Sequence, residues 1–201
     1  KASITSVYGS YPLLRSRQTN LSVQLAFDSK RLHDQVDTTN TSQKKRARVL
    51  MLSLQGDHRD SFAGGAFNTY SLTATAGHIN LQDPAVKAAD ASTARTQGSY
   101  GKLGFNLARL QSAGASTQFH AAASGQLASR NLDVSEKMSL GGANAVRAYP
   151  EGESYADQGF VLTLEARYTL PAASTVPGQV QLVGFVDTGA VTLNRNPWVA
   201  G

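Results

Sequence analysis

The feature that most constrains the fold is an alternation of apolar and polar residues with a period of two. In the segment 21–28 every second residue is apolar, from Leu21 to Phe27, and the residues between them are small or polar. The same pattern returns in the segments 70–76, 102–107, 118–121 and 161–168. Because successive side chains of a β-strand point to opposite faces of the sheet, this pattern predicts strands with one apolar and one polar face. Helical periodicity is weak throughout, so we expect an all-β protein.

The number and length of these segments favour a membrane barrel. The stretches 3–14, 46–57 and 180–193 bring the candidate strands to eight. Most exceed the roughly five or six residues usual in globular sheets, and a tilted strand needs about 9–11 residues to cross a bilayer. No run approaches the roughly 20 apolar residues of a membrane-spanning helix. We therefore expect an antiparallel up-and-down transmembrane β-barrel, with a soluble β-sandwich as the alternative.

The connections between the expected strands alternate in length. The links 14–20, 59–68, 111–116 and 171–179 are short to medium, whereas the links 34–45, 83–99 and 129–159 are longer and polar. Bacterial outer-membrane barrels have this asymmetry, because their extracellular loops are long and their periplasmic turns are short. The link lengths thus favour the barrel independently of the alternation.

Composition agrees with a barrel and excludes several kinds of site. Charged residues make up only 16% of the chain, against roughly 25% in an average soluble domain. A barrel needs only one apolar side chain in two, which explains the slightly negative mean hydropathy. The chain has no cysteine, which excludes a disulfide scaffold, thiolate catalysis and cysteine-based zinc sites. We expect no cofactor and no metal.

The histidines do not form a catalytic or metal-binding pattern. His33, His58, His78 and His120 lie in separate segments without metal-ligand spacing. His58 follows Asp57, but no Gly-x-Ser-x-Gly elbow or ordered third partner completes a hydrolase triad. We therefore interpret the histidines as turn and rim residues and expect no enzyme.

One basic cluster is present, formed by Lys44, Lys45, Arg46 and Arg48. It lacks the interleaved aromatic residues of a single-stranded nucleic-acid site, so we expect no nucleic-acid partner. Two interpretations stay open for it. The cluster either meets lipopolysaccharide phosphates at an extracellular rim or is a solvated strand entry.

The segment 136–159 differs from the alternating strands in its motifs. It contains Leu140-Gly141-Gly142, then Val146-Arg147-Ala148-Tyr149, then Gly152-Glu153 and Asp157-x-Gly159. Glu165-x-Arg167, Phe185-x-Asp187-x-Gly189 and Asn196-Pro197-Trp198 follow in that order. This series resembles the C-terminal barrel of two-partner secretion transporters, the TpsB or haemolysin-activator (ShlB/FhaC-like) family of the Omp85-type superfamily. Segments 11–17, 98–103 and 125–129 also resemble that family, so the likeness covers nearly the whole chain.

The resemblance implies a place for this chain in a larger protein. The family has a barrel of sixteen strands, and its register assigns about the sixth to the thirteenth strand to residues 1–201. The chain is thus expected to be part of the C-terminal transmembrane β-barrel domain. The first strands, the last strands and the periplasmic POTRA domains would lie outside it, and both ends look cut from something longer.

The resemblance also implies a function. We expect a translocation pore, a monomeric barrel in the outer membrane of a Gram-negative bacterium, that secretes a large β-rich exoprotein of the haemolysin or adhesin (TpsA-like) type. The alternative is an Omp85-type assembly factor that inserts other outer-membrane barrels, since the superfamily shares the arginine loop. A lipid-hydrolysing enzyme is a third interpretation, for which the sequence offers no convincing nucleophile.

The functional site implied by the resemblance is the long loop with Arg147. In the family this loop folds back inside the barrel, and its arginine pairs with carboxylates on the inner wall. Glu165 lies on the polar face of its strand by parity, and Asp187 shares a face with Gly189. Either carboxylate can receive a guanidinium in a bidentate pair, and we expect Asp187 as the main partner and Glu165 as the nearby alternative.

One position departs from the family motif. The family usually has glycine where this sequence has Ala148. Glycine would permit a positive φ, which alanine reaches only at a cost of about 1 kcal/mol. Either the loop uses ordinary backbone angles here, or a small side chain is all that the site requires.

The shared parity finally assigns the side chains to two faces. The residues expected to face lipid are Leu21, Val23, Leu25, Phe27, Leu103, Phe105, Leu107, Leu162 and Leu164. Those expected to face the lumen are Gln24, Asn106, Thr163, Glu165 and Asp187. A register slip of one residue would exchange the two faces.

Overall fold

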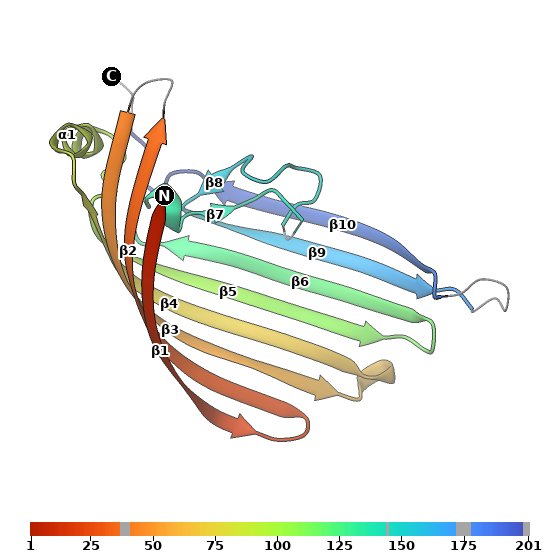
Figure 1. Cartoon of the computed structure of the whole chain (residues 1–201). Coiled ribbons are helices and arrows are strands. Elements are labelled where there is room, and N and C mark those ends of the chain that lie inside the picture. Colours follow the sequence, from red (N-terminus) through yellow and green to blue (C-terminus); the bar gives the residue numbers. More distant parts are fainter. Residues whose placement is uncertain (37–40, 144, 172–177, 199–201) are drawn as a thin grey trace.

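The structure is a computed structural model that describes residues 1–36, 41–143, 145–171 and 178–198, with only the backbone described for 34–36, 41 and 42. One antiparallel sheet of eight strands dominates it, in the order β1-β2-β3-β4-β5-β6-β9-β10 (Figure 1). The strands are β1 (Ala2–Arg15), β2 (Thr19–Val36), β3 (Thr41–Asp60), β4 (Ala66–Leu81), β5 (Gly98–Ser112), β6 (Thr117–Ala128), β9 (Gln158–Thr169) and β10 (Gln181–Thr192). The all-β, antiparallel, up-and-down architecture predicted from the sequence is confirmed.

The sheet is bent into an open trough, in which every strand lies beside its neighbour in the sequence of the meander (Figure 1). Short turns join β1 to β2, β3 to β4 and β5 to β6 at one end, here called the turn end. The opposite loop end carries the helix α1 (Pro84–Ser92) and the segment between β6 and β9. That segment contains the 3-10 turn η3 (Val134–Glu136) and a small antiparallel pair, β7 (Met138–Ser139) with β8 (Tyr155–Ala156).

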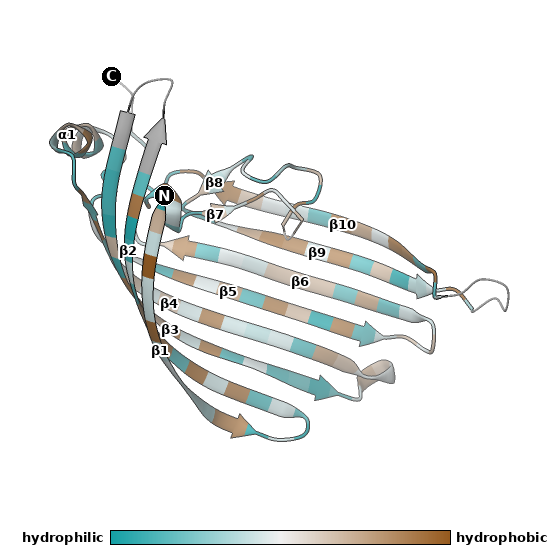
Figure 2. Cartoon of the chain, viewed as in Figure 1, coloured by the Kyte–Doolittle hydropathy of each residue, from teal (hydrophilic) through white to brown (hydrophobic). Residues whose placement is uncertain are grey.

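The register carries the alternation of side chains across the sheet, with one shift in the β1–β2 pairing, between Pro12 and Leu14. One row of paired residues is apolar and mostly exposed, namely Leu25, Leu52, Ala74, Leu103 and Leu127. The adjacent row is polar or small, namely Gln24, Ser53, Thr73, Gly104 and Gln126. Figure 2 shows the resulting alternation of hydrophobic and hydrophilic residues along the strands. The two sets of residues predicted above lie on opposite faces of the sheet.

Aromatic side chains cover glycines on both faces of the sheet. A Cβ atom on Gly77 would lie 2.1 Å from the ring of Tyr100 on the polar face, and a Cβ atom on Gly125 would lie 2.6 Å from the ring of Phe105 on the apolar face. Each ring therefore packs directly over the backbone of the neighbouring strand. Such pairs fix the strand register and allow local curvature.

A small apolar core lies on the polar face at the loop end. It consists of Ala47, Val49, Ile79, Leu81, Tyr100, Ala128 and Leu132, with Met51 and Val86 packed against it. Val86 belongs to α1 and Leu132 to the segment after β6, so this core attaches both loop-end structures to the inner wall. The polar face is therefore not uniformly open.

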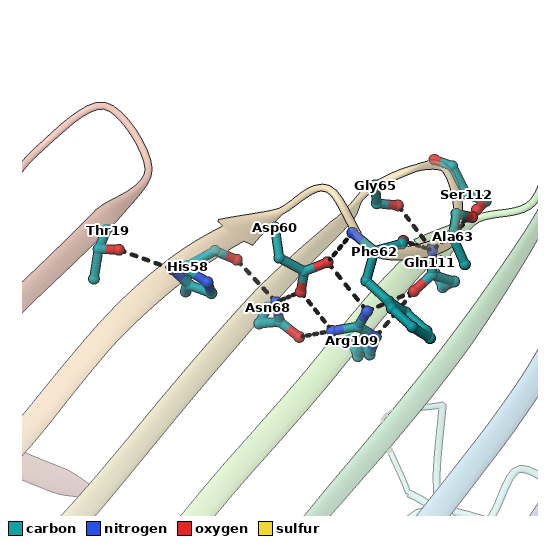
Figure 3. Close-up of polar contacts among 10 residues, drawn as sticks. All are labelled: Thr19, His58, Asp60, Phe62, Ala63, Gly65, Asn68, Arg109, Gln111 and Ser112. Carbon is teal, nitrogen blue, oxygen red and sulfur yellow. Dashed lines mark hydrogen bonds and ion pairs between the residues drawn. The ribbon is translucent and has the colours of Figure 1, made fainter.

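A polar network closes the turn end of β3, β4 and β5 (Figure 3). The Arg109 guanidinium donates to Asp60 and Asn68, each at 2.8 Å, and also to Gln111. The Gln111 amide nitrogen lies 2.9–3.2 Å from four backbone carbonyl oxygens around the turn. Gly64 and Gly65 have positive φ values of 102° and 94°, which glycine adopts without a steric penalty. The network thus holds a sharp turn in place.

His58 joins this rim through the Thr19 hydroxyl, 2.8 Å from its Nδ1 atom (Figure 3). Asp57, its neighbour in the sequence, instead accepts a hydrogen bond from the Asn20 amide. The two side chains therefore contact different partners. This arrangement agrees with the interpretation of His58 as a rim residue.

Two expectations about the connections are wrong. The sequence predicts a long polar loop over 34–45, but β2 and β3 remain paired as far as Val36 and Thr41, and of this link only 37–40 lie outside the described residues. Two alternating strands can simply continue past a polar stretch, because backbone pairing does not require apolar side chains. The link 83–99 contains α1, which weak helical periodicity did not predict. Asp83 caps its first turn and Pro84 occupies its first position, a local signal of a helix start.

Among the residues that the structure describes, no helix is long and apolar enough to cross a membrane.

The first prediction concerns the two faces. In the full-length protein in membranes, spin labels at Leu25 and Leu107 should be accessible to an apolar relaxant such as oxygen, because they lie on the exposed apolar face. Labels at Asn106 and Thr163, on the opposite face, should be accessible to a water-soluble nickel relaxant. Continuous-wave electron paramagnetic resonance measures both. Oxygen access at Asn106 and Thr163 would contradict the assignment of the lumen.

Candidate functional site

The candidate site is the segment 129–157, which lies across the polar face of the sheet. Its ion-pair partners come from both sides of the trough. Lys30, Lys45 and Lys102 belong to β2, β3 and β5, whereas Glu165 and Asp187 belong to β9 and β10. We call residues 129–137 the loop base and residues 140–154 the loop tip.

Small residues allow the loop tip to pack closely. A Cβ atom on Gly141 would lie 2.2 Å from the Pro150 carbonyl oxygen, and Gly142 has a φ of 113°. Leu140 packs against Gly189 of β10, where a Cβ atom would lie 2.8 Å from Leu140 Cδ1. Val146 is buried, whereas Tyr149 is exposed.

Ala148 uses ordinary backbone angles. The described residues other than glycine with positive φ are Ala63 and Arg95, and Ala148 is not among them. The departure from the family motif therefore introduces no left-handed alanine into this loop. Of the two alternatives raised for this position, the structure shows the first.

Arg147 binds both carboxylates named from the sequence. Its Nε and Nη2 atoms donate to the two Asp187 carboxylate oxygens at 2.7 and 2.8 Å, and its Nη1 atom donates to Glu165 Oε1 at 2.7 Å. The Arg147 backbone N–H also donates to Asp187, at 3.1 Å. The guanidinium lies 3.6 Å from the ring centroid of Phe185, a cation–π contact. The loop tip is thus held through one residue by five interactions, four from its side chain and one from its backbone.

The carboxylates come from adjacent strands by register. Asp187 pairs with Thr163, and Glu165 pairs with Phe185, so the two acids lie diagonally on one face. Glu165 is shared, because Arg167 donates to its second oxygen at 2.8 Å. The hydrogen bond from Arg147 to Asp187 raises the pKa of the guanidinium above its ordinary value, against a smaller opposing effect of burial. Arg147 therefore stays charged at every physiological pH.

The loop base is held by residues that the sequence analysis did not single out as a site. Glu136 pairs with Lys30 at 2.8 Å and with Lys102 at 3.1 Å, and Asp133 pairs with Lys45 at 2.9 Å. Lys45 is 5% exposed. The expectation that Lys45 belongs to a solvated or lipid-contacting cluster is therefore wrong. Side chains alternate between the two faces along β3. Lys45 therefore lies on the polar face, whereas Lys44 and Arg46, which are exposed, lie on the other face.

Two further buried polar residues tie the loop base to the rest of the loop end. Asp157 is fully buried and accepts hydrogen bonds from the backbone N–H groups of Leu132 and Arg195, at 3.0 and 2.7 Å. The Asn131 amide donates to carbonyl oxygens of Ala94 and Asn196. Asp157 and Asn196 belong to motifs already quoted, so the motif order was a signal for them. Glu136 and Asp133 had no such signal.

Electrostatics keep the acids of the loop base charged. Burial alone would raise the pKa of Glu136, but the hydrogen bond from Lys30 and the charges of Lys102 and Lys30 lower it below its ordinary value. Burial would also raise the pKa of Asp133, but the hydrogen bonds from Ser135 and Lys45 outweigh this effect and lower the pKa below its ordinary value. Both carboxylates are therefore ionised at neutral pH.

The described part of the chain contains no group of three or more histidine, aspartate or glutamate side chains arranged to hold a metal ion. The site's chemistry is that of ion pairs and hydrogen bonds between a loop and a wall.

An antiparallel sheet with one apolar and one polar face, whose polar face receives a loop through an arginine, is the architecture of an outer-membrane transport barrel. The model of the family Haemolysin secretion/activation protein ShlB/FhaC/HecB matches residues 2–198. The chain belongs to this family, whose members are two-partner secretion transporters of the Gram-negative outer membrane.

Individual relatives match over part of their length. The heme/hemopexin transporter protein HuxB of Haemophilus influenzae strain 86-028NP is 25% identical over 164 residues, covering 82% of this chain and 29% of HuxB. HuxB of a second strain of that species matches equally. CdiB from Escherichia coli has a similar structure, with a TM-score of 0.76, 17% identity, and coverage of 98% of this chain and 36% of the CdiB chain. The chain thus spans about a third or less of these relatives, and the likeness to CdiB concerns the fold.

The second prediction tests the bidentate pairing of the Arg147 guanidinium with Asp187. In the full-length protein, Arg147→Lys keeps the charge but loses the planar, bidentate geometry, so the docked state of the loop tip should lose about 1–3 kcal/mol. Faster proteolysis within the exposed stretch 148–153 would report this loss. Asp187→Asn should act similarly, and the double variant should be little worse than either single variant. Arg195→Lys, at an exposed position, is the control, and additive effects of the two single changes would contradict the pairing.

The third prediction concerns acid. The lowered pKa values mean that the loop base has its full stability above the ordinary values of 4.5 for Glu136 and 3.8 for Asp133. That stability is lost as the pH falls through the lower folded-state values, because protonated acids no longer pair with lysines. A fluorescent probe at the exposed Val134, introduced as Val134→Cys, should report reversible loosening below about pH 4. Glu136→Gln removes one titrating group and should shrink the transition, and an unchanged transition would contradict its origin.

Proposed function

We propose that this chain forms part of the wall of an outer-membrane pore through which a large, β-rich exoprotein of the haemolysin or adhesin type is secreted. The observation that carries the proposal is the arginine-anchored loop on the polar face. A sheet with an exposed apolar outer face and a polar inner face suits a barrel with a wet lumen. A loop held inside the barrel by a directional ion pair suits a pore that must control what its lumen contains.

The proposed role of the loop motif is to hold the barrel in a working conformation. The motif residues are Leu140, Gly141, Gly142, Val146, Arg147, Ala148 and Tyr149, and the wall partners are Asp187 and Glu165. Ordering a loop of this length opposes folding by roughly 1–2 kcal/mol per residue of backbone entropy. Several contacts must therefore act together, and the bidentate ion pair of Arg147 supplies the directional contact. The exoprotein would thread the lumen in an unfolded form and fold outside.

The rest of the protein is proposed from the same resemblance. Residues 1–201 would form about the sixth to the thirteenth strand of a sixteen-stranded, monomeric barrel, with further strands and POTRA domains in other parts of the polypeptide. The exposed side chains of Lys44, Arg46 and Arg48, at the loop end of β3, are proposed to meet lipopolysaccharide phosphates. No bond chemistry is required of any residue.

The fourth prediction tests secretion. In a full-length protein, Arg147→Ala and Asp187→Ala should each reduce release of the cognate exoprotein about tenfold, because each removes the directional anchor of the loop tip. The double variant should be little worse, and the charge swap Arg147→Asp with Asp187→Arg should restore part of the release. Immunoblots of medium and outer membrane measure exoprotein and barrel separately. Arg195→Ala is the matched control.

Other outer-membrane barrels should keep their normal amounts in the same cells. Loss of those barrels, with exoprotein release unaffected, would overturn the secretion proposal in favour of the assembly factor. Normal secretion by Arg147→Ala would overturn the role of the loop motif.

A further inference from the structure

Three lysines on the inner wall form ion pairs with the loop base. Lys30, Lys45 and Lys102 come from β2, β3 and β5 and share the polar face. Lys30 and Lys102 pair with Glu136, and Lys45 pairs with Asp133. One short segment thus supplies the counter-charge for three wall strands.

Glu136 bridges two strands that are not neighbours. Its Oε1 atom lies 2.8 Å from Lys30 Nζ on β2, and its Oε2 atom lies 3.1 Å from Lys102 Nζ on β5. The strands β3 and β4 lie between them. Three inter-strand spacings of about 4.8 Å separate β2 and β5 by roughly 14 Å along the sheet. One carboxylate can join both lysines because the wall curves around it.

The position of Glu136 is itself fixed by the surrounding structure. The Asp133 side chain caps the η3 turn through the Ser135 N–H at 3.0 Å, and the Gln126 amide of β6 donates to the Glu136 carbonyl oxygen at 3.3 Å. Lys102 Nζ donates to the same carbonyl oxygen at 2.9 Å. The Glu136 residue is 4% exposed. A carboxylate held this firmly cannot follow one lysine if the other moves away.

We propose that Glu136 is a positioning residue that sets the curvature of the wall between β2 and β5 and thereby the width of the lumen at the loop end. Flattening the wall would separate Glu136 from one lysine and leave buried charge uncompensated, which strongly disfavours the flattened state. The Arg147 anchor acts on β9 and β10 and leaves this part of the wall free. The inference rests on the proposed pore, for which the width of the lumen matters.

The test uses the full-length protein in membranes. This chain has no cysteine, so Arg31→Cys and Leu103→Cys place two spin labels on the outer face, one on β2 and one on β5, away from the lumen. Double electron–electron resonance then measures the distance between the two strands. Glu136→Gln should lengthen and broaden this distance distribution, and Glu136→Asp, which keeps the charge but is shorter, should have an intermediate effect. Glu153→Gln, exposed in the same loop, is the matched control.

Single-channel recording supplies a second readout that a purely stabilising residue would not change. Fluctuations of the open-state current should become about tenfold more frequent in Glu136→Gln, which corresponds to about 1.4 kcal/mol. Lys102→Gln releases β5 while Glu136 keeps Lys30, and it should reproduce both changes. It decides the question if Glu136→Gln fails to fold.

The outcomes separate this inference from the function on which it rests. A folded Glu136→Gln or Lys102→Gln variant with the wild-type distance distribution and current would overturn the role of Glu136. A wild-type protein that conducts no ions and secretes nothing would overturn the proposed pore, while the distance measurement would still decide whether Glu136 holds the wall.

Discussion

Backbone pairing between neighbouring strands is the constraint on which the rest of this structure depends. Each strand places alternate side chains on opposite faces, and the pairing of the eight strands combines them into one apolar and one polar surface. A shift of one residue in any strand would move its lysines or carboxylates to the apolar side. The ion pairs on the polar face therefore form only because the neighbouring strands are paired in the correct register.

The charges on the polar face determine how the loop lies across it. The wall is basic on β2, β3 and β5 and acidic at Glu165 and Asp187, while the loop is acidic at its base and basic at Arg147. Each end of the loop meets the opposite charge, and the reversed placement would bring like charges together. Charge complementarity here selects one orientation of the loop, which is a matter of specificity more than of net stability.

The two anchors differ in their exposure to water, and this difference suggests different mechanical roles. The Glu136 side chain is 3% exposed and meets two lysines, whereas the Arg147 side chain is 25% exposed on a tip with several exposed residues. Breaking a buried pair leaves an uncompensated charge with little water to solvate it, while a partly wet guanidinium is solvated as it leaves. The loop base is accordingly the firmer attachment, and the tip is the part that water can help to release.

The sequence by itself determined the strands and their two faces, because period-two alternation is a local property of the chain. The partners of Arg147 were implied by the resemblance of the ordered motifs to the two-partner secretion family. The extent of β2 and β3, the presence of α1, and the burial of Lys45 were decided only in three dimensions. The alternation of side chains could place Lys45 on the polar face, but no residue near it in the sequence indicates that its partner is Asp133, 88 positions away. The ion pairs of Glu136 likewise depend on the curvature of the sheet across four strands, which no single segment of the sequence determines. The ion pairs of the loop base with Lys30, Lys45 and Lys102 join segments far apart in the sequence across a curved sheet, and so only the tertiary structure shows them.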